Sequence, residues 1–184
     1  LRENLMGKTY EKIDDKLSAF IRDQKLFFVA TAPLSGDGLV NLSPKGLDGT
    51  FAVLDEHTVA YLDLTGSGVE TIAHLKENGR ITILFCAFEG SPNLLRLYGT
   101  GEPIEPHHPE FNSLLTHFST YSDVRSIIRV RVERIADSCG FGVPVYEYQG
   151  HRETLIKYAD NKGPDGMDLY RRETNACLLY TSDA

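Results

Sequence analysis

Short runs of Val, Ile, Leu and Phe alternate with polar residues along most of the chain, and this pattern is typical of β-strands. Glycine, serine and aspartate separate the runs, as expected for tight turns. The predicted strands cover residues 26–32, 39–43, 50–54, 58–63, 80–88, 94–104 and 128–133. Many short strands with few helices favour a small antiparallel barrel, because closing a sheet removes its exposed edges.

Apolar residues at helical spacing occur in fewer places. Ile13, Leu17 and Ile21 lie on one face of a helix, so residues 10–24 are predicted to be an amphipathic helix. Residues 139–145, CGFGVPV, are expected to form a loop. Further helices are predicted over residues 69–78, 107–118, 153–161 and 165–174, with a turn at 162–164 between the last two.

The segment 61–79, YLDLTGSGVETIAHLKENG, carries the strongest local signal. A predicted strand ends at a polar turn, residues 65–68, and a short helix begins immediately afterwards. Ser67 is placed to cap this helix, Glu70 completes a capping box, and Gly79 suits its C-terminus. Free backbone N–H groups at a helix N-terminus are suited to binding a phosphate.

A second polar segment, residues 41–46 (NLSPKG), is predicted to form a turn that adds a cation, Lys45. Each segment alone has an ordinary structural explanation, because capping boxes and Ser-Pro turns are common. Their joint placement predicts a protein that holds a phosphorylated cofactor on a β-scaffold.

Composition and charge restrict the possible functions. The 184 residues suit a single domain, and a net charge of −7 with scattered Lys and Arg argues against a nucleic-acid-binding surface. Three cysteines without a CxxC pair predict neither a disulfide framework nor a zinc site, and they favour the cytoplasm. No apolar run approaches the roughly 20 residues that span a bilayer. The histidines lack metal-ligand spacing, so no metal site is predicted.

Three segments carry a family resemblance: VATAPLSGDGLVNLSPKG at 29–46, YLDLTGSGVETIAHLKENGRITILF at 61–85 and LLRLYGTGEPI at 94–104. On these residues, the chain resembles the pyridoxamine 5′-phosphate oxidase-like family of FMN-binding split barrels over residues 8–176. The resemblance implies one domain, mainly β with inserted helices, built as a six-stranded antiparallel split β-barrel. It also implies a homodimer that holds FMN at its interface. Residues 1–7 and 178–184 are expected to be non-native or disordered ends.

The resemblance implies that two polar segments bind the FMN phosphate. The first contributes Ser43, Pro44, Lys45 and Gly46, and the second contributes Thr65, Gly66, Ser67 and Thr71. Relatives nearest the true oxidase place basic residues where Gly68 and Val69 stand here. Neutralisation of the phosphate is therefore expected to fall on Lys45, backbone N–H groups and hydroxyls, with Arg80 or Arg96 as further candidates.

The leading expectation is a flavin-dependent oxidoreductase that acts on an unidentified small molecule. No side chain is predicted to be catalytic, because a flavin supplies its own redox chemistry. The chain has no Trp and so lacks the Trp-containing substrate signature of the true oxidase. Two alternatives stay open: a deazaflavin- or haem-binding relative, and a non-catalytic flavin-binding or sensing protein.

Overall fold

The computed structural model describes residues 7–175, so the two predicted non-native ends, Gly7 apart, lie outside the described residues. The strands are β1 (Thr9–Tyr10), β2 (Leu26–Thr31), β3 (Asn41–Gly46), β4 (Phe51–Asp55), β5 (Thr58–Leu64), β6 (Arg80–Cys86), β7 (Leu94–Ile104) and β8 (Val124–Ser138). The helices are α1 (Asp15–Asp23), α2 (Glu70–Asn78), α3 (Phe111–Leu115) and α4 (Thr154–Thr174). The sheet has more strands than the six that the resemblance implies: residues 7–175 contain eight, among them the two-residue β1, which pairs with β8.

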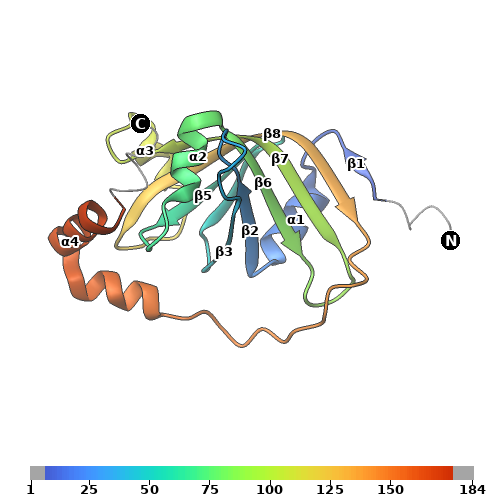
Figure 1. Ribbon diagram of the computed structural model, residues 1–184. Helices are drawn as coiled ribbons and strands as arrows, with labels where there is room; N and C mark the ends of the chain where they lie inside the picture. Colours follow the sequence, from blue (N-terminus) through green and yellow to red (C-terminus); the bar gives the residue numbers. More distant parts are fainter. Residues whose placement is uncertain (1–6, 176–184) are drawn as a thin grey trace.

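All the strands belong to one antiparallel sheet in the order β3-β2-β6-β7-β8-β5-β4, with β1 attached to β8. The sheet curls, so that Lys45 Nζ of the edge strand β3 lies 3.3 Å from Asp63 Oδ1 of β5, the strand next to the other edge (Figure 1). Side chains rather than ladder hydrogen bonds connect β3 to β5 there. We call this opening the seam. The predicted mainly-β, barrel-type architecture with inserted helices is confirmed.

The register between β2 and β3 determines which β3 side chains face the interior. Directly paired residues share one face of an antiparallel sheet. Asn41, Ser43 and Lys45 pair with Thr31, Val29 and Phe27, which are buried inside the barrel. Three polar side chains of an edge strand therefore point inward, while Leu42 and Pro44 are exposed.

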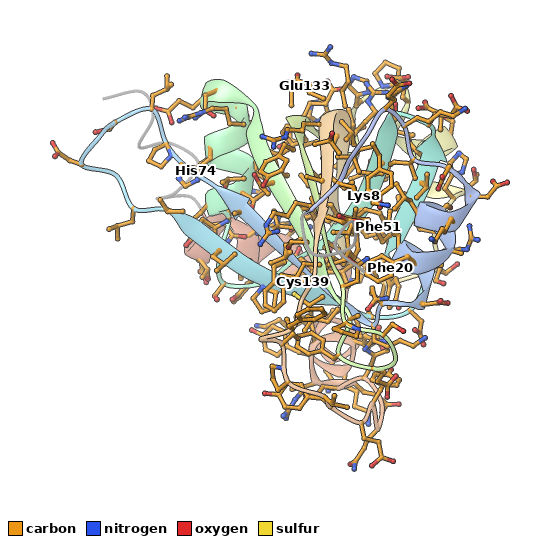
Figure 2. All side chains as sticks on the ribbon, turned by 90° about the vertical axis from the view of Figure 1, so that its right-hand side faces the viewer. Lys8, Phe20, Phe51, His74, Glu133 and Cys139 are labelled. Carbon is orange, nitrogen blue, oxygen red and sulfur yellow. The ribbon has the colours of Figure 1, made fainter. Side chains whose placement is uncertain are left out.

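The main hydrophobic core fills the barrel and includes residues from α1 and α2 as well as the strands. Phe27 and Phe51 meet edge to face, with ring centroids 4.9 Å apart. Phe20 of α1 and Phe51 of β4 are half-buried against this core (Figure 2). A second cluster packs Phe111 of α3 against β5, β7 and β8.

Two helices are shorter than predicted. α1 begins at Asp15 because the Asp14 side chain caps it, accepting a hydrogen bond from Leu17 N at 2.8 Å. The residues before that cap pair with β8 as β1. α3 begins after Pro109, which disfavours a helical conformation in the residue before it. The predicted break at 162–164 is confirmed, since Gly163 interrupts α4 with a φ of 66°.

The predicted turn at residues 41–46 is wrong, because these residues form β3. One side of β3 has no neighbouring strand, so it tolerates Pro44, which lacks a backbone N–H. The chain turns later, where Leu47 and Gly49 have positive φ values of 77° and 68°. Inward-facing polar residues consequently come from a strand rather than from a loop.

Candidate functional site

A cavity of about 270 Å³ opens at the seam, between the second half of β3 and the N-terminus of α2. We call it the seam cavity. Its wall combines residues of β3, β5, the 65–68 turn, the first turn of α2 and β8. The lining residues are Ser43, Pro44, Lys45, Asp63, Leu64, Gly66, Ser67, Gly68, Val69, Glu70, Thr71 and Arg125.

The seam cavity brings together residues of both predicted phosphate-binding segments. Those that line it are Ser43, Pro44, Lys45, Gly66, Ser67 and Thr71. Gly46 borders a different cavity, next to the turn that follows β3. Thr65 is buried beside the seam cavity, and its hydroxyl accepts a hydrogen bond from Arg171 Nη1 at 3.2 Å.

Asp63 is the buried carboxylate of this wall, with a side chain that is 1% exposed. It accepts hydrogen bonds from Arg125 Nε at 2.7 Å and Lys45 Nζ at 3.3 Å. The Arg125 side chain is 9% exposed and that of Lys45 is 25% exposed. A buried charge without a partner is strongly destabilising, so the two cations and the carboxylate hold one another in place.

The predicted capping box at the start of α2 is wrong. The helix begins at Glu70 with Val69 as its N-cap residue, and no side chain makes a capping hydrogen bond. Ser67 lies two residues before this N-cap residue and is exposed. Gly79 ends the helix in the left-handed conformation, with φ 71°, as predicted. The first N–H groups of α2 therefore have no side-chain cap.

The Glu70 carboxylate lies against the 65–68 turn. A methyl group built on Gly68 would lie 2.5 Å from Glu70 Oε2. A negative side chain in the first turn of a helix interacts favourably with the helix dipole. The same position beside the helix N-terminus is where an incoming anion would bind, so Glu70 would repel it.

The C-terminal end of α4 reaches the same turn (Figure 1). Asn175 is fully buried, and its Nδ2 donates to the carbonyl oxygens of Gly66 at 3.3 Å and Ser67 at 3.2 Å. Arg125 Nη2 donates to the Gly68 carbonyl oxygen at 2.9 Å, and its Nη1 donates to Asn175 Oδ1 at 3.1 Å. α4 is thus physically part of the site.

A chain of polar side chains starts from Asn41 of β3. Asn41 Nδ2 donates to Thr71 Oγ1 at 3.0 Å and to Thr31 Oγ1 at 3.2 Å, and its Oδ1 accepts from Ser43 Oγ at 2.9 Å. Thr31 Oγ1 also lies 3.0 Å from Nδ1 of His74, which α2 carries (Figure 2). The Ser43 hydroxyl therefore donates its proton to Asn41, whereas the Thr71 hydroxyl accepts from Asn41 and can donate to an acceptor in the cavity.

Tyr61 lies on the same inward face of β5 as Asp63. Its hydroxyl is buried and has no hydrogen-bond partner within residues 7–175. Burial, followed by the nearby Asp63 carboxylate, raises the pKa of Tyr61 well above its ordinary value. The phenol consequently stays protonated and does not act as an anion in the barrel.

A larger cavity, of about 670 Å³, lies beside the end of α1 and the turn between β6 and β7. Its wall is rich in aromatic rings, and Phe88 stacks on Tyr146 with centroids 5.4 Å apart. No helix begins at this cavity, so uncapped helical N–H groups are absent from its described wall. We therefore place the candidate phosphate site in the seam cavity despite its smaller volume.

Over residues 7–175, no group of three or more His, Cys, Asp and Glu side chains could hold a metal ion. Within the same range, no helix is long and apolar enough to cross a membrane.

Sequence reasoning missed three functional candidates, Asp63, Arg125 and Asn175. Asp63 lies inside an apolar strand, and a buried acid there is a signal that could have pointed to a buried cation. Arg125 lies before the predicted strand, which in the structure begins at Val124. The proposed alternatives do not line the seam cavity: Arg80 donates to the Pro33 carbonyl oxygen, and Arg96 donates to Ser138.

Known proteins similar to this chain share its family and its fold. The family model for Pyridoxamine 5'-phosphate oxidase matches residues 13–139. The chain is 44% identical over 148 residues to the Pyridoxamine 5'-phosphate oxidase family protein ustO of Aspergillus flavus, a match that covers 79% of this chain and 59% of that protein. The chain thus spans less than two thirds of the length of this curated relative.

Two solved structures of tagged HupZ from Group A Streptococcus show a similar fold. The form in which one histidine is replaced by alanine has a TM-score of 0.53 at 23% identity, covering 68% of this chain and 98% of that chain. The form without that substitution has a TM-score of 0.51 at 25% identity, covering 67% and 91%. The family match contains all residues that line the seam cavity, whereas α4 and Asn175 lie beyond it. The chain therefore belongs to the pyridoxamine 5'-phosphate oxidase family.

Proposed function

We propose that this protein binds FMN with the phosphate in the seam cavity, and that it is a flavin-dependent oxidoreductase acting on a small molecule. The observation that carries the proposal is the convergence of Lys45, Arg125 and the uncapped N-terminus of α2 on one cavity. A phosphate monoester carries nearly two negative charges at neutral pH. Cations and helix N-terminal N–H groups are the donors that bind such a group most strongly.

The donor set fits one phosphate, although nearby carboxylates offset the positive charge of the two cations. Lys45 and Arg125 are offset by the Asp63 and Glu70 carboxylates, so the cavity wall is close to neutral. Lys45 is the more exposed of the two cations and is free to turn from Asp63 toward a phosphate. The Thr71 hydroxyl and the exposed Ser67 hydroxyl are further donors.

Bound FMN would accept a hydride or two electrons and pass them to an acceptor. The residues of this chain hold and orient the cofactor. Asp63 is engaged with two cations, so we assign it no proton transfer. No other side chain of the seam cavity receives a catalytic role.

We further propose that the protein works as a homodimer. Leu39, Val40 and Leu42 are 87%, 71% and 64% exposed along the edge strand β3 and the residues before it. Contiguous exposed apolar side chains of this kind mark an interaction surface. A second copy there would cover them beside the open seam. Light scattering should give a dimeric mass, and a monomeric mass at micromolar concentration argues against this proposal.

Titration with FMN and with riboflavin tests the cofactor proposal, because riboflavin lacks only the phosphate. The unmodified protein should bind FMN more tightly. Lys45→Ala should weaken FMN binding by about 1–3 kcal/mol, or roughly 5- to 150-fold, and leave riboflavin binding nearly unchanged. Lys12→Ala is the control, since Lys12 pairs with Glu56 on the surface at 2.6 Å. Equal affinity of the unmodified protein for both flavins would reject the phosphate site.

The two alternatives are separated by simple observations on the purified protein. The absorption spectrum of the released ligand distinguishes a flavin from a deazaflavin or a haem. Steady-state oxidation of NADH or NADPH with an added acceptor distinguishes an enzyme from a binding or sensing protein. A flavin-loaded protein with no turnover under any of these donors would favour the sensing role.

A further inference from the structure

We propose that Asn175 and Arg125 are positioning residues that orient the 65–68 turn for phosphate, so that α4 determines how well the protein distinguishes FMN from riboflavin. This inference rests on the proposed function. It differs from that function because Asn175 does not line the seam cavity, and because Arg125, besides supplying charge, holds the turn through the Gly68 carbonyl oxygen. It concerns the end of α4, which lies beyond the residues that the family match covers.

Three successive carbonyl groups of the turn are held from one side. Asn175 Nδ2 donates to the carbonyl oxygens of Gly66 and Ser67, at 3.3 and 3.2 Å. Arg125 Nη2 donates to the carbonyl oxygen of Gly68 at 2.9 Å. Local side chains of the turn supply none of these donors.

Holding these carbonyls also fixes the N–H groups of the turn. The peptide bonds are trans, and the C=O of one residue points opposite to the N–H of the next. The N–H groups of Ser67, Gly68 and Val69 therefore point away from the Asn175 and Arg125 donors. No backbone carbonyl oxygen within residues 7–175 accepts a hydrogen bond from them. Successive free N–H groups that point together form an anion-binding nest.

The two ends of the Asn175 side-chain amide have different partners, and this fixes which end faces the turn. Its Oδ1 accepts from Arg125 Nη1 at 3.1 Å, which leaves Nδ2 as the group that faces the carbonyls. Arg125 is fixed in turn by Asp63, with Nε 2.7 Å from Oδ2. Asn175 is fully buried and the Arg125 side chain is 9% exposed, so water does not readily replace either donor.

A second contact from α4 supports the same turn. Arg171 Nη1 donates to the hydroxyl of Thr65 at 3.2 Å, and it also pairs with Asp123. The extended segment that follows β8 leads to α4 (Figure 1), whose Ala159 and Met167 are buried. At the end of the helix, the contacts of Arg171 and Asn175 with the 65–68 turn and its neighbours are polar, so changes there act directly on the turn.

Asn175→Asp is the sharpest test, because it keeps the size of the side chain and replaces the donor with an acceptor. A carboxylate facing the Gly66 and Ser67 carbonyls would be repelled by them, and the peptide planes would reorient. We expect affinity for FMN to fall roughly ten- to hundredfold, since hydrogen bonds to a charged group are lost. Affinity for riboflavin should change less than about twofold. Asn175→Ala should show the same selectivity loss to a smaller extent.

Asn78→Asp is a matched control. Asn78 Nδ2 donates to the Ala32 carbonyl oxygen at 2.8 Å, and its Oδ1 accepts from the side chain of Arg80 at 3.2 Å, away from the seam cavity. It should lose stability and keep the preference for FMN. If Asn175→Asp does not fold, Arg125→Lys carries the test, since lysine keeps the charge but not the fork that reaches three acceptors.

Three outcomes separate the possibilities. A falling ratio of FMN to riboflavin affinity in the Asn175 and Arg125 variants, but not in Asn78→Asp, supports positioning. Lower stability in urea with an unchanged ratio in all variants means that Asn175 is only structural and overturns the inference. No preference for FMN in the unmodified protein rejects the proposed function itself, and the positioning role with it.

Discussion

Replacing Glu70 by Gln should tighten FMN binding while slightly destabilising the protein. The Glu70 carboxylate lies against Gly68 at the N-terminus of α2, where the proposed phosphate would bind. For a phosphate about 5–6 Å away at an effective dielectric constant of about 40, the repulsion is about 1.5 kcal/mol per phosphate charge. Glu70 is only half-buried and can move toward water, so much of this repulsion is relieved.

The expected net gain in FMN affinity is therefore about 0.7–1.5 kcal/mol, or roughly three- to tenfold. The free energy of unfolding without ligand should fall by about 0.3–1 kcal/mol, because a favourable interaction with the helix dipole is lost. Calorimetric titration and urea unfolding measure the two effects separately. Their opposite signs distinguish this explanation from general damage to the site, which would lower both quantities.

Glu77→Gln is the control on the same helix. Its carboxylate accepts a hydrogen bond from Leu34 N at 2.9 Å, and it does not line the seam cavity. FMN affinity should be unchanged in this variant. Unchanged or weaker FMN binding in Glu70→Gln would refute the reasoning, since it would place the phosphate away from the α2 N-terminus.

Three further substitutions test individual side-chain contacts of the site and of the fold. Asp63→Asn should cost about 3–5 kcal/mol of stability in urea unfolding, because it leaves a buried guanidinium without a counter-charge; a loss below about 1 kcal/mol would mean that the pair is well solvated. Ser67→Ala should change stability by less than about 0.5 kcal/mol, because Ser67 caps nothing, so any loss of FMN affinity reports a direct contact. Burial and the hydrogen bond to Asp137 raise the pKa of Tyr10 from 10.0 to about 12. A raised pKa adds stability that is complete below pH 10.0 and is lost as the pH rises toward 12. In urea unfolding, the decrease in the free energy of unfolding between these pH values should therefore be smaller in Tyr10→Phe than in the unmodified protein.

Sequence patterns correctly predicted the strands, helix ends and breaks that depend on neighbouring residues. The apolar runs located β2, β5, β6 and β7, and Gly163 marked the break in α4. Gly79 was identified as the end of α2 because a left-handed residue there favours glycine. Glycine is typical of strand irregularities, and the register of β7 with β8 shifts between Tyr98 and Gly99. Each of these depends on residues close together in the sequence.

The errors arose where distant partners outweigh local preference. Ser-Pro-Lys-Gly has turn chemistry, yet pairing with β2 extends these residues as β3. Tyr10 fits a helical pattern but pairs with Ile135 of β8 instead. Asn175 lies in an ordinary polar stretch, and only the return of α4 to the 65–68 turn gives it a role. No periodicity within a segment carries that information.

The seam explains why the polar groups of the site lie where they do. Strand pairing joins the neighbouring strands of the sheet, but at the seam β3 and β5 face each other through side chains. The Asp63 carboxylate is buried there and pairs with the partly exposed Lys45 across the seam. The carboxylate that stabilises the open seam thus also competes with a phosphate for the same cation. We therefore expect FMN affinity to depend on the free energy needed to separate Lys45 from Asp63. Comparing the FMN affinities of Asp63→Asn and Lys45→Ala would measure that dependence.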